Sequence, residues 1–279
     1  MKILDIFDVS GKVTAITGGA SGFGLALARV MATNGAHVTI IDVNAEGLKA
    51  AQAELAAEGM KVATAVADVT DKSAIEAAIN GVVAGSGRLD VLFVNAGVTG
   101  GPGFMQLNGE RNPATQIESQ SNELWEKVLA INLMGAVKTI QAGVPHMKKQ
   151  GGGRIIVTSS CSATKTEMFV GSGYVTSKAA LAHLIKQLAH ELAAFNITVN
   201  GIAPGPTATN IGGGRMKDPA AAAGFSTYIP MERVGQPEDI VGAALFFASS
   251  ASNYVTGAEI LVDGGFVLGP SDRAIVPRN

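Results

Sequence analysis

Two side chains suited to proton transfer lie four residues apart in a segment predicted to be helical. Tyr174 and Lys178 belong to the sequence YVTSK, and residues at positions i and i+4 of a helix share one face. Tyrosine has an unperturbed pKa of about 10, which a neighbouring ammonium group lowers by favouring the phenolate. The spacing predicts that Tyr174 exchanges a proton with an alcohol or ketone oxygen. Ser160, after a predicted strand, could hydrogen-bond the same oxygen.

A glycine-rich turn predicts the partner in this reaction. Residues 17–24 read TGGASGFG and join a predicted strand to a predicted helix, so the backbone can approach a pyrophosphate at the helix N-terminus. The position at the start of a strand–helix–strand unit favours dinucleotide binding over a plain tight turn. The residues expected at the phosphates are Gly18, Ser21, Gly22, Phe23 and Gly24.

An acidic residue indicates which nicotinamide cofactor binds. Asp42 ends the second predicted strand about twenty residues after the turn, where the adenosine ribose is expected, with Val43 beside it. Its carboxylate would accept hydrogen bonds from the ribose hydroxyls and repel a 2′-phosphate. Neither the glycine turn nor the positions directly after Asp42 contain Arg or Lys. NAD is therefore favoured over NADP; the alternative is that Asp42 only caps the next helix.

These residues need a scaffold, and the hydrophobic pattern predicts one. Short Val- and Ile-rich runs alternate with longer helical stretches, which predicts an α/β, doubly wound parallel sheet, the Rossmann fold, in a single domain over residues 1–279. Strands are expected at 13–17, 36–42, 61–67, 91–95, 154–159, 198–202 and 259–262. Helices are expected at 24–35, 45–59, 72–85, 123–149, 173–195 and 237–249.

Three stretches fall outside this alternation. Residues 99–121 form a polar inserted loop, residues 210–230 contain three consecutive glycines, and residues 266–279 form a C-terminal tail. Long loops within a compact domain are often functional, so 210–230 is predicted to be a substrate lid. The tail could contact a neighbouring subunit or fray.

Several motifs in a fixed order make the chain resemble the short-chain dehydrogenase/reductase family. From about residue 11 to 265 the matching segments are TGGASGFG, Asp68-Val69, Asn95-Ala96-Gly97, Asn132, Ser159-Ser160, YVTSK, Pro204-Gly205 with Thr209, and VTGAEILVDGG at 255–265. The sequence departs from the family pattern at Val94, where a second asparagine is usual, and in the length of 99–121.

The resemblance implies roles for single residues. It implies that Tyr174 is the acid/base, that Ser160, rather than Ser159, positions the substrate oxygen, and that Asn132 holds a water in a proton relay. Lys178 is implied to bind the nicotinamide ribose and to lower the pKa of Tyr174. The other residues implied at the cofactor are Asp68, Val69, Asn95, Ala96, Gly97, Pro204, Gly205, Thr207 and Thr209.

Composition and charge exclude several classes of protein. Of 279 residues 47% are hydrophobic and 16% charged, with a net charge of −2 and no basic stripe, so neither nucleic acid nor a membrane is an expected partner. Cys161 is the only cysteine, which favours a cytoplasmic location, and no His or Cys spacing predicts a metal site. Apolar positions on more than one side of residues 179–194, together with the resemblance, predict a homotetramer.

The sequence thus predicts an NAD-dependent oxidoreductase that transfers hydride between nicotinamide and a secondary alcohol or ketone. The expected substrate pocket, at Thr99, Met168, Phe169, Ile211, Phe225 and Tyr228, is mostly apolar and favours a small-molecule alcohol or ketone with an apolar body. One alternative is a non-catalytic NAD-binding redox sensor or scaffold, which would have no use for the Ser160, Tyr174 and Lys178 set. Another is dehydration or epimerisation on the same fold.

Overall fold

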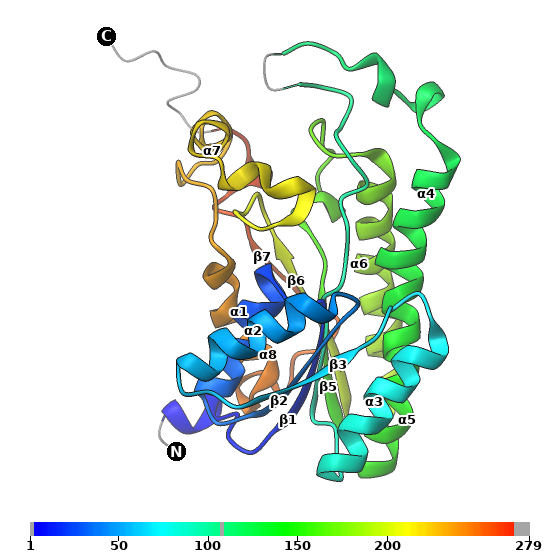
Figure 1. Cartoon of the computed structure of the whole chain (residues 1–279), viewed down its shortest axis with the longest axis vertical. Helices are drawn as coiled ribbons and strands as arrows, with labels where there is room; N and C mark the ends of the chain where they lie inside the picture. The colour runs from blue at the N-terminus through cyan, green and yellow to red at the C-terminus, as the bar shows by residue number, and fades with distance from the viewer. Residues whose placement is uncertain (1–2, 107–108, 271–279) are drawn as a thin grey trace.

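The computed structural model describes residues 3–106 and 109–270, and its centre is a parallel sheet of seven strands (Figure 1). The strand order is β3-β2-β1-β4-β5-β6-β7. Every neighbouring pair is parallel. The strands are β1 (Val13–Thr17), β2 (His37–Asp42), β3 (Val62–Val66), β4 (Val91–Val94), β5 (Gly153–Thr158), β6 (Ile197–Pro204) and β7 (Glu259–Val262).

The middle of the sheet is apolar on both faces. All residues of β1 and β4 are buried, as expected for parallel strands that helices cover on both sides. Ile16 of β1 pairs with Ile40 of β2 and with Phe93 of β4. The chain order reverses between β1 and β4, and the carboxyl ends of strands at such a switch point are where this architecture binds ligands.

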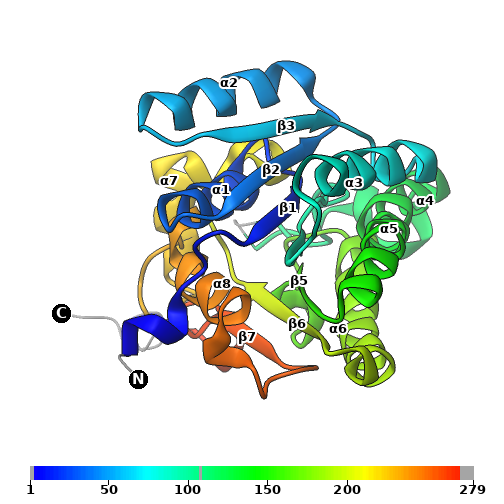
Figure 2. The ribbon, with the colours of Figure 1, turned by 90° about the horizontal axis from the view of Figure 1, so that it is seen from below.

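Helices form a layer on each face of the sheet (Figure 2). One layer holds α1, α2 and α8, and the other holds α3, α5 and α6. The helices are α1 (Gly22–Thr33), α2 (Ala45–Ala57), α3 (Lys72–Ser86), α4 (Asn122–Leu129), α5 (Gly135–Gln150), α6 (Ser172–Leu192), α7 (Pro219–Ser226) and α8 (Val241–Ala248). The 3-10 helices are Ile3–Phe7, Pro113–Thr115, Ile117–Ser119, Cys161–Ala163, Ala193–Phe195, Ile211–Lys217, Pro237–Ile240, Ser250–Ser252 and Phe266–Leu268.

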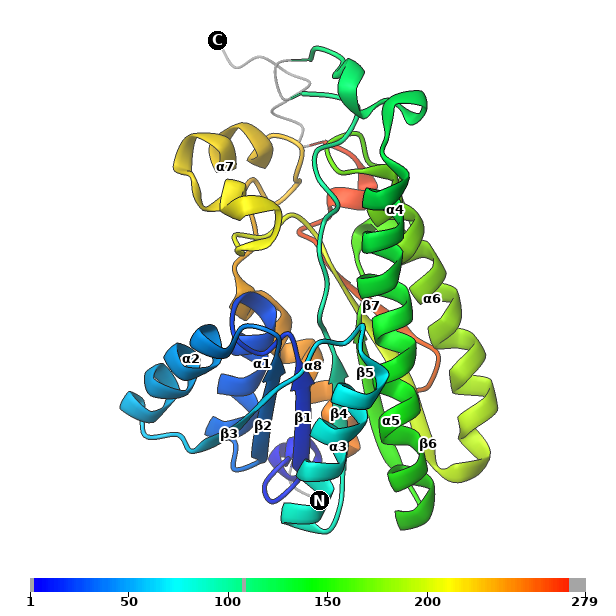
Figure 3. The same cartoon turned by 45° about the vertical axis from the view of Figure 1, so that its right-hand side comes forward.

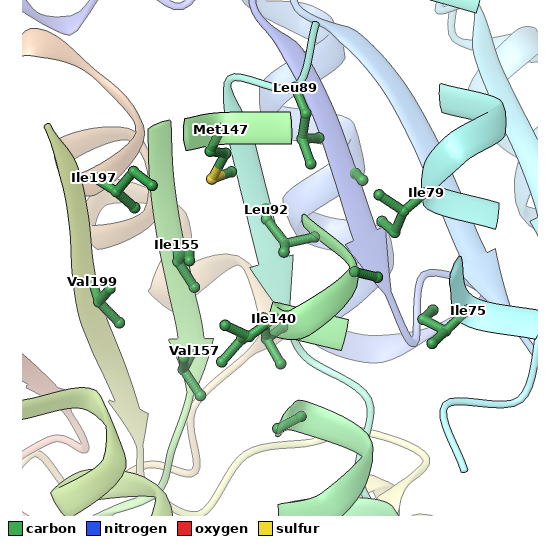
Figure 4. Packing of buried hydrophobic residues seen from close by; sticks show 14 of the residues in the cluster. Ile75, Ile79, Leu89, Leu92, Ile140, Met147, Ile155, Val157, Ile197 and Val199 are labelled. Carbon is green, nitrogen blue, oxygen red and sulfur yellow. The ribbon is translucent and has the colours of Figure 1, made fainter. Parts of the chain in front are cut away.

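Branched aliphatic side chains fill the space between the sheet and the second layer. Leu92, Ile155 and Val199 from three strands meet Ile79 of α3 and Ile140 of α5 in one buried cluster (Figure 4). At about 25 cal/mol per Å² of buried apolar surface, this contact is a main source of stability. The strands and helices that carry the site are therefore held rigidly.

One long helical segment contains a π-helical turn. Asn122–Gln150 is continuous, with α4 and α5 joined by the π-helix Ala130–Met134. By length and hydropathy this segment is the one candidate membrane span within the described residues, a test that core helices of soluble proteins also pass. Its apolar side packs in the buried cluster through Ala136, Ile140 and Met147, which accounts for its composition.

The expected alternation of strands and helices and the single domain are confirmed, with boundaries shifted by a few residues. The stretch 99–121 contains two 3-10 helices, and its residue Pro102 pairs with Val170 as an antiparallel bridge. Together with α7 it lies at one end of the molecule (Figure 3). The C-terminal stretch begins with buried Phe266, whose carbonyl accepts a hydrogen bond from Lys165 Nζ at 2.7 Å; the remainder, 271–279, lies outside the described residues.

Candidate active site

A cavity of about 790 Å³ opens at the carboxyl ends of the strands. It brings together residues that are far apart in the sequence, from the β1–α1 turn to the segment after β6. The predicted residues that line it are Gly18, Ser21, Gly22, Phe23, Asp42, Asn95, Ala96, Gly97, Ser160, Tyr174, Lys178, Pro204, Gly205, Thr207 and Thr209. Most of the site predicted from the sequence therefore faces one space.

The turn between β1 and α1 has the geometry needed to hold a phosphate. Gly18 and Gly22 adopt positive φ angles of +67° and +54°, which L side chains rarely adopt. A Cβ at Gly24 would lie 2.0 Å from the Gly18 carbonyl oxygen, so only glycine fits there. Ser21 caps α1 without a side-chain hydrogen bond, and the first N–H groups of the helix remain available to an anion.

Asp42 lines the cavity at the end of β2. Its carboxylate accepts hydrogen bonds from the backbone N–H of Ala20 at 3.2 Å and of Asn44 at 3.0 Å. The N-cap of α2 is Asn44, whose side chain accepts from Gly47. The alternative that Asp42 only caps this helix is therefore wrong. The carboxylate ties the glycine turn to the end of β2 and still faces the cavity.

Asn95 connects the ends of three strands beside the cavity through side-chain hydrogen bonds. Its Nδ2 donates to the carbonyl oxygens of Thr17 at 3.0 Å and of Gly18 at 3.3 Å. Its Oδ1 accepts from Thr158 Oγ1 at 3.0 Å. The side chain thus links β1, β4 and β5 and holds their ends in position where they line the cavity.

The residues predicted to take part in proton transfer come from two elements, the 3-10 helix Cys161–Ala163 and α6. Ser160, the N-cap of the first, is buried and its Oγ accepts from Ser162 N at 3.1 Å. Lys178 is buried, and its Nζ donates to the Thr158 carbonyl at 2.8 Å. The same Nζ lies 5.6 Å from the centroid of the Tyr174 ring, so the helical spacing does place the two side chains together.

The pKa of Tyr174 differs from the sequence-based expectation. Burial raises it to about 12, a hydrogen bond with the Ser160 side chain lowers it, and the neighbouring Cys161 and Glu167 side chains raise it further. Lys178 is not among the causes of this shift, in which desolvation of the phenolate dominates. Burial also lowers the pKa of Lys178 to about 8, with Glu259 opposing.

Five predicted residues lie outside the cavity lining: Gly24, Val43, Asp68, Val69 and Asn132. Asn132 lies in the π-helical turn and binds the backbone of Val98, accepting from its N–H at 2.8 Å and donating to its carbonyl at 2.9 Å. It also donates to Ser177 Oγ at 3.0 Å. Asn132 therefore fixes the loop after β4 against α6. For these five residues, a contribution to cofactor binding or catalysis stays a prediction.

The other end of the cavity has an apolar wall. Thr99, Phe169, Ile211 and Phe225 line it as expected. Met168 is exposed and does not line the cavity. Tyr228 does not line it either, but its ring contacts those of Phe169 and Phe225, at 5.5 and 5.8 Å between centroids.

Sequence reasoning missed Glu167 in this wall. No periodic pattern marks it, because it lies in an irregular segment before α6.

The structure also bears on a thiol nucleophile and on a metal site. Cys161 is buried, and burial raises its thiol pKa to about 12, so it does not present a thiolate. Within the described residues no group of three or more His, Cys, Asp or Glu is placed to hold a metal ion.

Comparison with known proteins gives the family. A family model described as Enoyl-(Acyl carrier protein) reductase, adh_short_C2, matches residues 18–267. The chain is 34% identical to 5-keto-D-gluconate 5-reductase of Escherichia coli (strain K12), covering 95% of this chain and 98% of that protein. This chain belongs to the short-chain dehydrogenase/reductase family.

Two further family members illustrate the range of substrates and cofactors. The chain is 36% identical to cyclohexanol dehydrogenase of Rhodococcus sp. (strain TK6), covering 94% of this chain and 98% of that one. A gluconate 5-dehydrogenase from Burkholderia cenocepacia J2315, solved with NADP and tartrate, superposes with a TM-score of 0.83 at 32% identity, over 95% and 98% of the two chains.

Proposed function

We propose that this protein is an NAD(H)-dependent oxidoreductase that interconverts a secondary alcohol and a ketone, with Tyr174 as the general acid/base. The observation that carries the proposal is the single cavity lined by Ser160, Tyr174 and Lys178 at one end and by the β1–α1 glycine turn at the other. The family and the names of the relatives support hydride transfer on CH–OH groups.

The residues suggest how the proton moves. When bound, the nicotinamide ring accepts or donates the hydride. Ser160 would hydrogen-bond the substrate oxygen and so orient the reacting carbon. In reduction, neutral Tyr174 gives its proton to the oxygen of the ketone; in oxidation, its phenolate takes the proton of the hydroxyl. The Tyr174 pKa of about 12 favours the neutral form, and the Lys178 ammonium offsets this when the phenolate is needed.

For the cofactor, we propose NAD rather than NADP. Asp42 lines the cavity at the end of β2, where its negative charge would repel a 2′-phosphate. Ser21 and Phe23, not Arg or Lys, stand at the turn. The NADP-bound relative from Burkholderia cenocepacia makes direct measurement of this preference necessary.

The test is turnover with NAD⁺ and with NADP⁺ over a panel of secondary alcohols, followed by the absorbance of the reduced cofactor. We expect NAD⁺-dependent oxidation of at least one class of alcohol. Binding of NADH, seen by its fluorescence, without turnover on any member of a broad panel would instead support a non-catalytic redox sensor.

We also propose a homotetramer in the cytoplasm, with residues 210–230 acting as a lid. Half-buried Leu184 and Leu188 lie beside the buried stripe of α6, which leaves apolar surface for a second subunit. Light scattering on the purified protein tests the mass of the assembly, and a monomer would contradict it.

A further inference from the structure

A carboxyl group stands in the apolar wall of the substrate end. Glu167 lines the cavity with Ser160 and Tyr174, next to the buried cluster that contains Cys161, Phe169 and Phe225. Placing a carboxylate in apolar surroundings is unfavourable unless a donor satisfies it. A Glu at this position therefore needs a reason that packing alone does not supply.

Within residues 3–106 and 109–270, the hydrogen-bond partner of Glu167 is a weak one. Its Oε1 accepts from Cys161 Sγ at 3.8 Å, and a thiol is a poor donor. The cation of the same segment, Lys165, is engaged elsewhere: its Nζ donates to the Phe266 carbonyl at 2.7 Å and lies 4.0 Å from the centroid of the Phe266 ring. The carboxyl group thus keeps acceptor capacity toward the cavity.

The ionisation of Glu167 reflects this isolation. Burial raises its pKa to about 7, while the charge of Lys165 and the Cys161 thiol act in the opposite direction. A hydroxyl group donated by a ligand would stabilise the ionised form, because hydrogen bonds to a charged acceptor are stronger than neutral ones.

Glu167 is also close to the reacting groups. Cys161 Sγ lies 4.0 Å from Ser160 Oγ and 3.8 Å from Glu167 Oε1, so one sulfur atom stands between the catalytic hydroxyl and the carboxylate. The negative charge of Glu167 contributes to the raised pKa of Tyr174. Since O–H···O hydrogen bonds span only about 2.7 to 2.8 Å, a substrate that reaches both ends must carry its two oxygens on nearby carbons.

We propose that Glu167 is a specificity-determining residue that binds a second hydroxyl group of the substrate, one or two carbons from the reacting carbon. This rests on the proposed function and narrows its substrate class to diols and hydroxyketones. Phe169 and Phe225 would pack against the carbon skeleton of the same molecule. The apolar wall would then hold the carbon skeleton, and the Glu167 carboxylate would bind the second hydroxyl group.

The test compares two ligands that differ by one hydroxyl group. Cyclohexane-1,2-diol and cyclohexanol serve for oxidation. For binding, the same two alcohols are titrated into the enzyme–NADH complex, which contains no hydride acceptor for them, while the NADH fluorescence is followed. The variants are Glu167→Leu and Glu167→Gln, with Glu191→Gln, an exposed glutamate on α6, as the control. The binding arm needs no turnover, so it tests Glu167 even if the proposed activity fails.

For the wild type we expect a preference of about 10- to 100-fold for the diol, the range of one hydrogen bond to a charged group. Glu167→Leu should abolish this preference, whereas Glu167→Gln should keep part of it. An effect of the lost charge on the pKa of Tyr174 would change the rates of both alcohols by the same factor and leave their ratio unaltered. An equal loss for both members in Glu167→Leu, the absence of a wild-type preference, or a stronger preference for 2-aminocyclohexanol than for the diol would overturn the proposal.

Discussion

The cofactor end of the cavity is lined by strand ends and the β1–α1 turn, whereas the substrate end is lined by irregular segments. At the first end, Asn95 donates to the Thr17 carbonyl of β1 and Asp42 accepts from the Ala20 N–H of the β1–α1 turn, so the surface is fixed to the sheet. At the second end, three consecutive glycines, Gly212 to Gly214, all have positive φ angles.

The difference separates two tasks. A rigid sheet edge places the cofactor and the proton-transfer groups in constant geometry, which chemistry requires. Loops can change in length and sequence without disturbing the core, so they determine which substrate is accepted. The two aromatic side chains and Glu167 at the substrate end are therefore expected to affect specificity, and the residues at the cofactor end to affect every substrate alike.

The largest effect is expected at Lys178. Replacing it by Met removes a buried ammonium beside Tyr174 and breaks the hydrogen bond to the Thr158 carbonyl. We expect kcat/KM to fall by about 10²- to 10⁴-fold for all substrates, the range of acid/base catalysis. Lys186→Met, at an exposed position of α6, is the control and should retain activity. Near-normal rates in Lys178→Met would show that proton transfer does not depend on Lys178.

A smaller effect is expected at Asp42. Asn retains an oxygen that can accept from Ala20 or Asn44 but removes the negative charge. We expect Asp42→Asn to raise kcat/KM for NADP⁺ and to lower it for NAD⁺, changing the ratio by about 10- to 100-fold. Initial rates with both cofactors measure this, and the same change with every alcohol is required by the account. An unchanged ratio would remove Asp42 from cofactor selection.

The pH dependence of stability should reveal the strained carboxyl group at the substrate end. The pKa of Glu167 is raised from 4.5 to about 7 in the folded chain, so its protonation favours the folded state below pH 4.5. This contribution is lost as the pH rises through 7. Glu167→Gln should therefore unfold at a higher temperature than the wild type at pH 8, by a few °C, and at a similar temperature at pH 5. A difference that does not vary with pH would contradict the raised pKa.

The smallest effect is expected at the glycine run. Gly213 has φ +74° with open space around its Cβ position, so Ala there disturbs the backbone alone, at about 1 kcal/mol. We expect Gly213→Ala to change KM by a few-fold and to leave NADH binding unchanged. Gly242→Ala, in α8 and also with open space, should have no effect on KM. An effect on NADH binding would mean that the two ends are coupled.

The fold could be predicted from the sequence because short, β-branched runs such as Val13–Thr17, which is fully buried, alternate with longer helical stretches, and the glycine turn has a fixed spacing. The relation of Tyr174 to Lys178 follows from helix geometry alone. The position of Glu167 in the cavity wall and that of Met168 outside it could not be predicted, because irregular segments have no periodicity that orients side chains. The raised pKa of Tyr174 could not be predicted either, because burial at a site formed by distant segments is not apparent from neighbouring residues in the sequence.

Single-turnover hydride transfer by Tyr174→Phe, in the enzyme saturated with NAD⁺, tests the central claim most directly. The ring is kept and only the hydroxyl is removed, while Tyr228→Phe in the adjacent aromatic cluster is the control. We expect unchanged NADH binding and a rate lower by about 10²- to 10⁴-fold in Tyr174→Phe, with normal transfer in the control. A Tyr174→Phe enzyme that reduces NAD⁺ at close to the wild-type rate would contradict it.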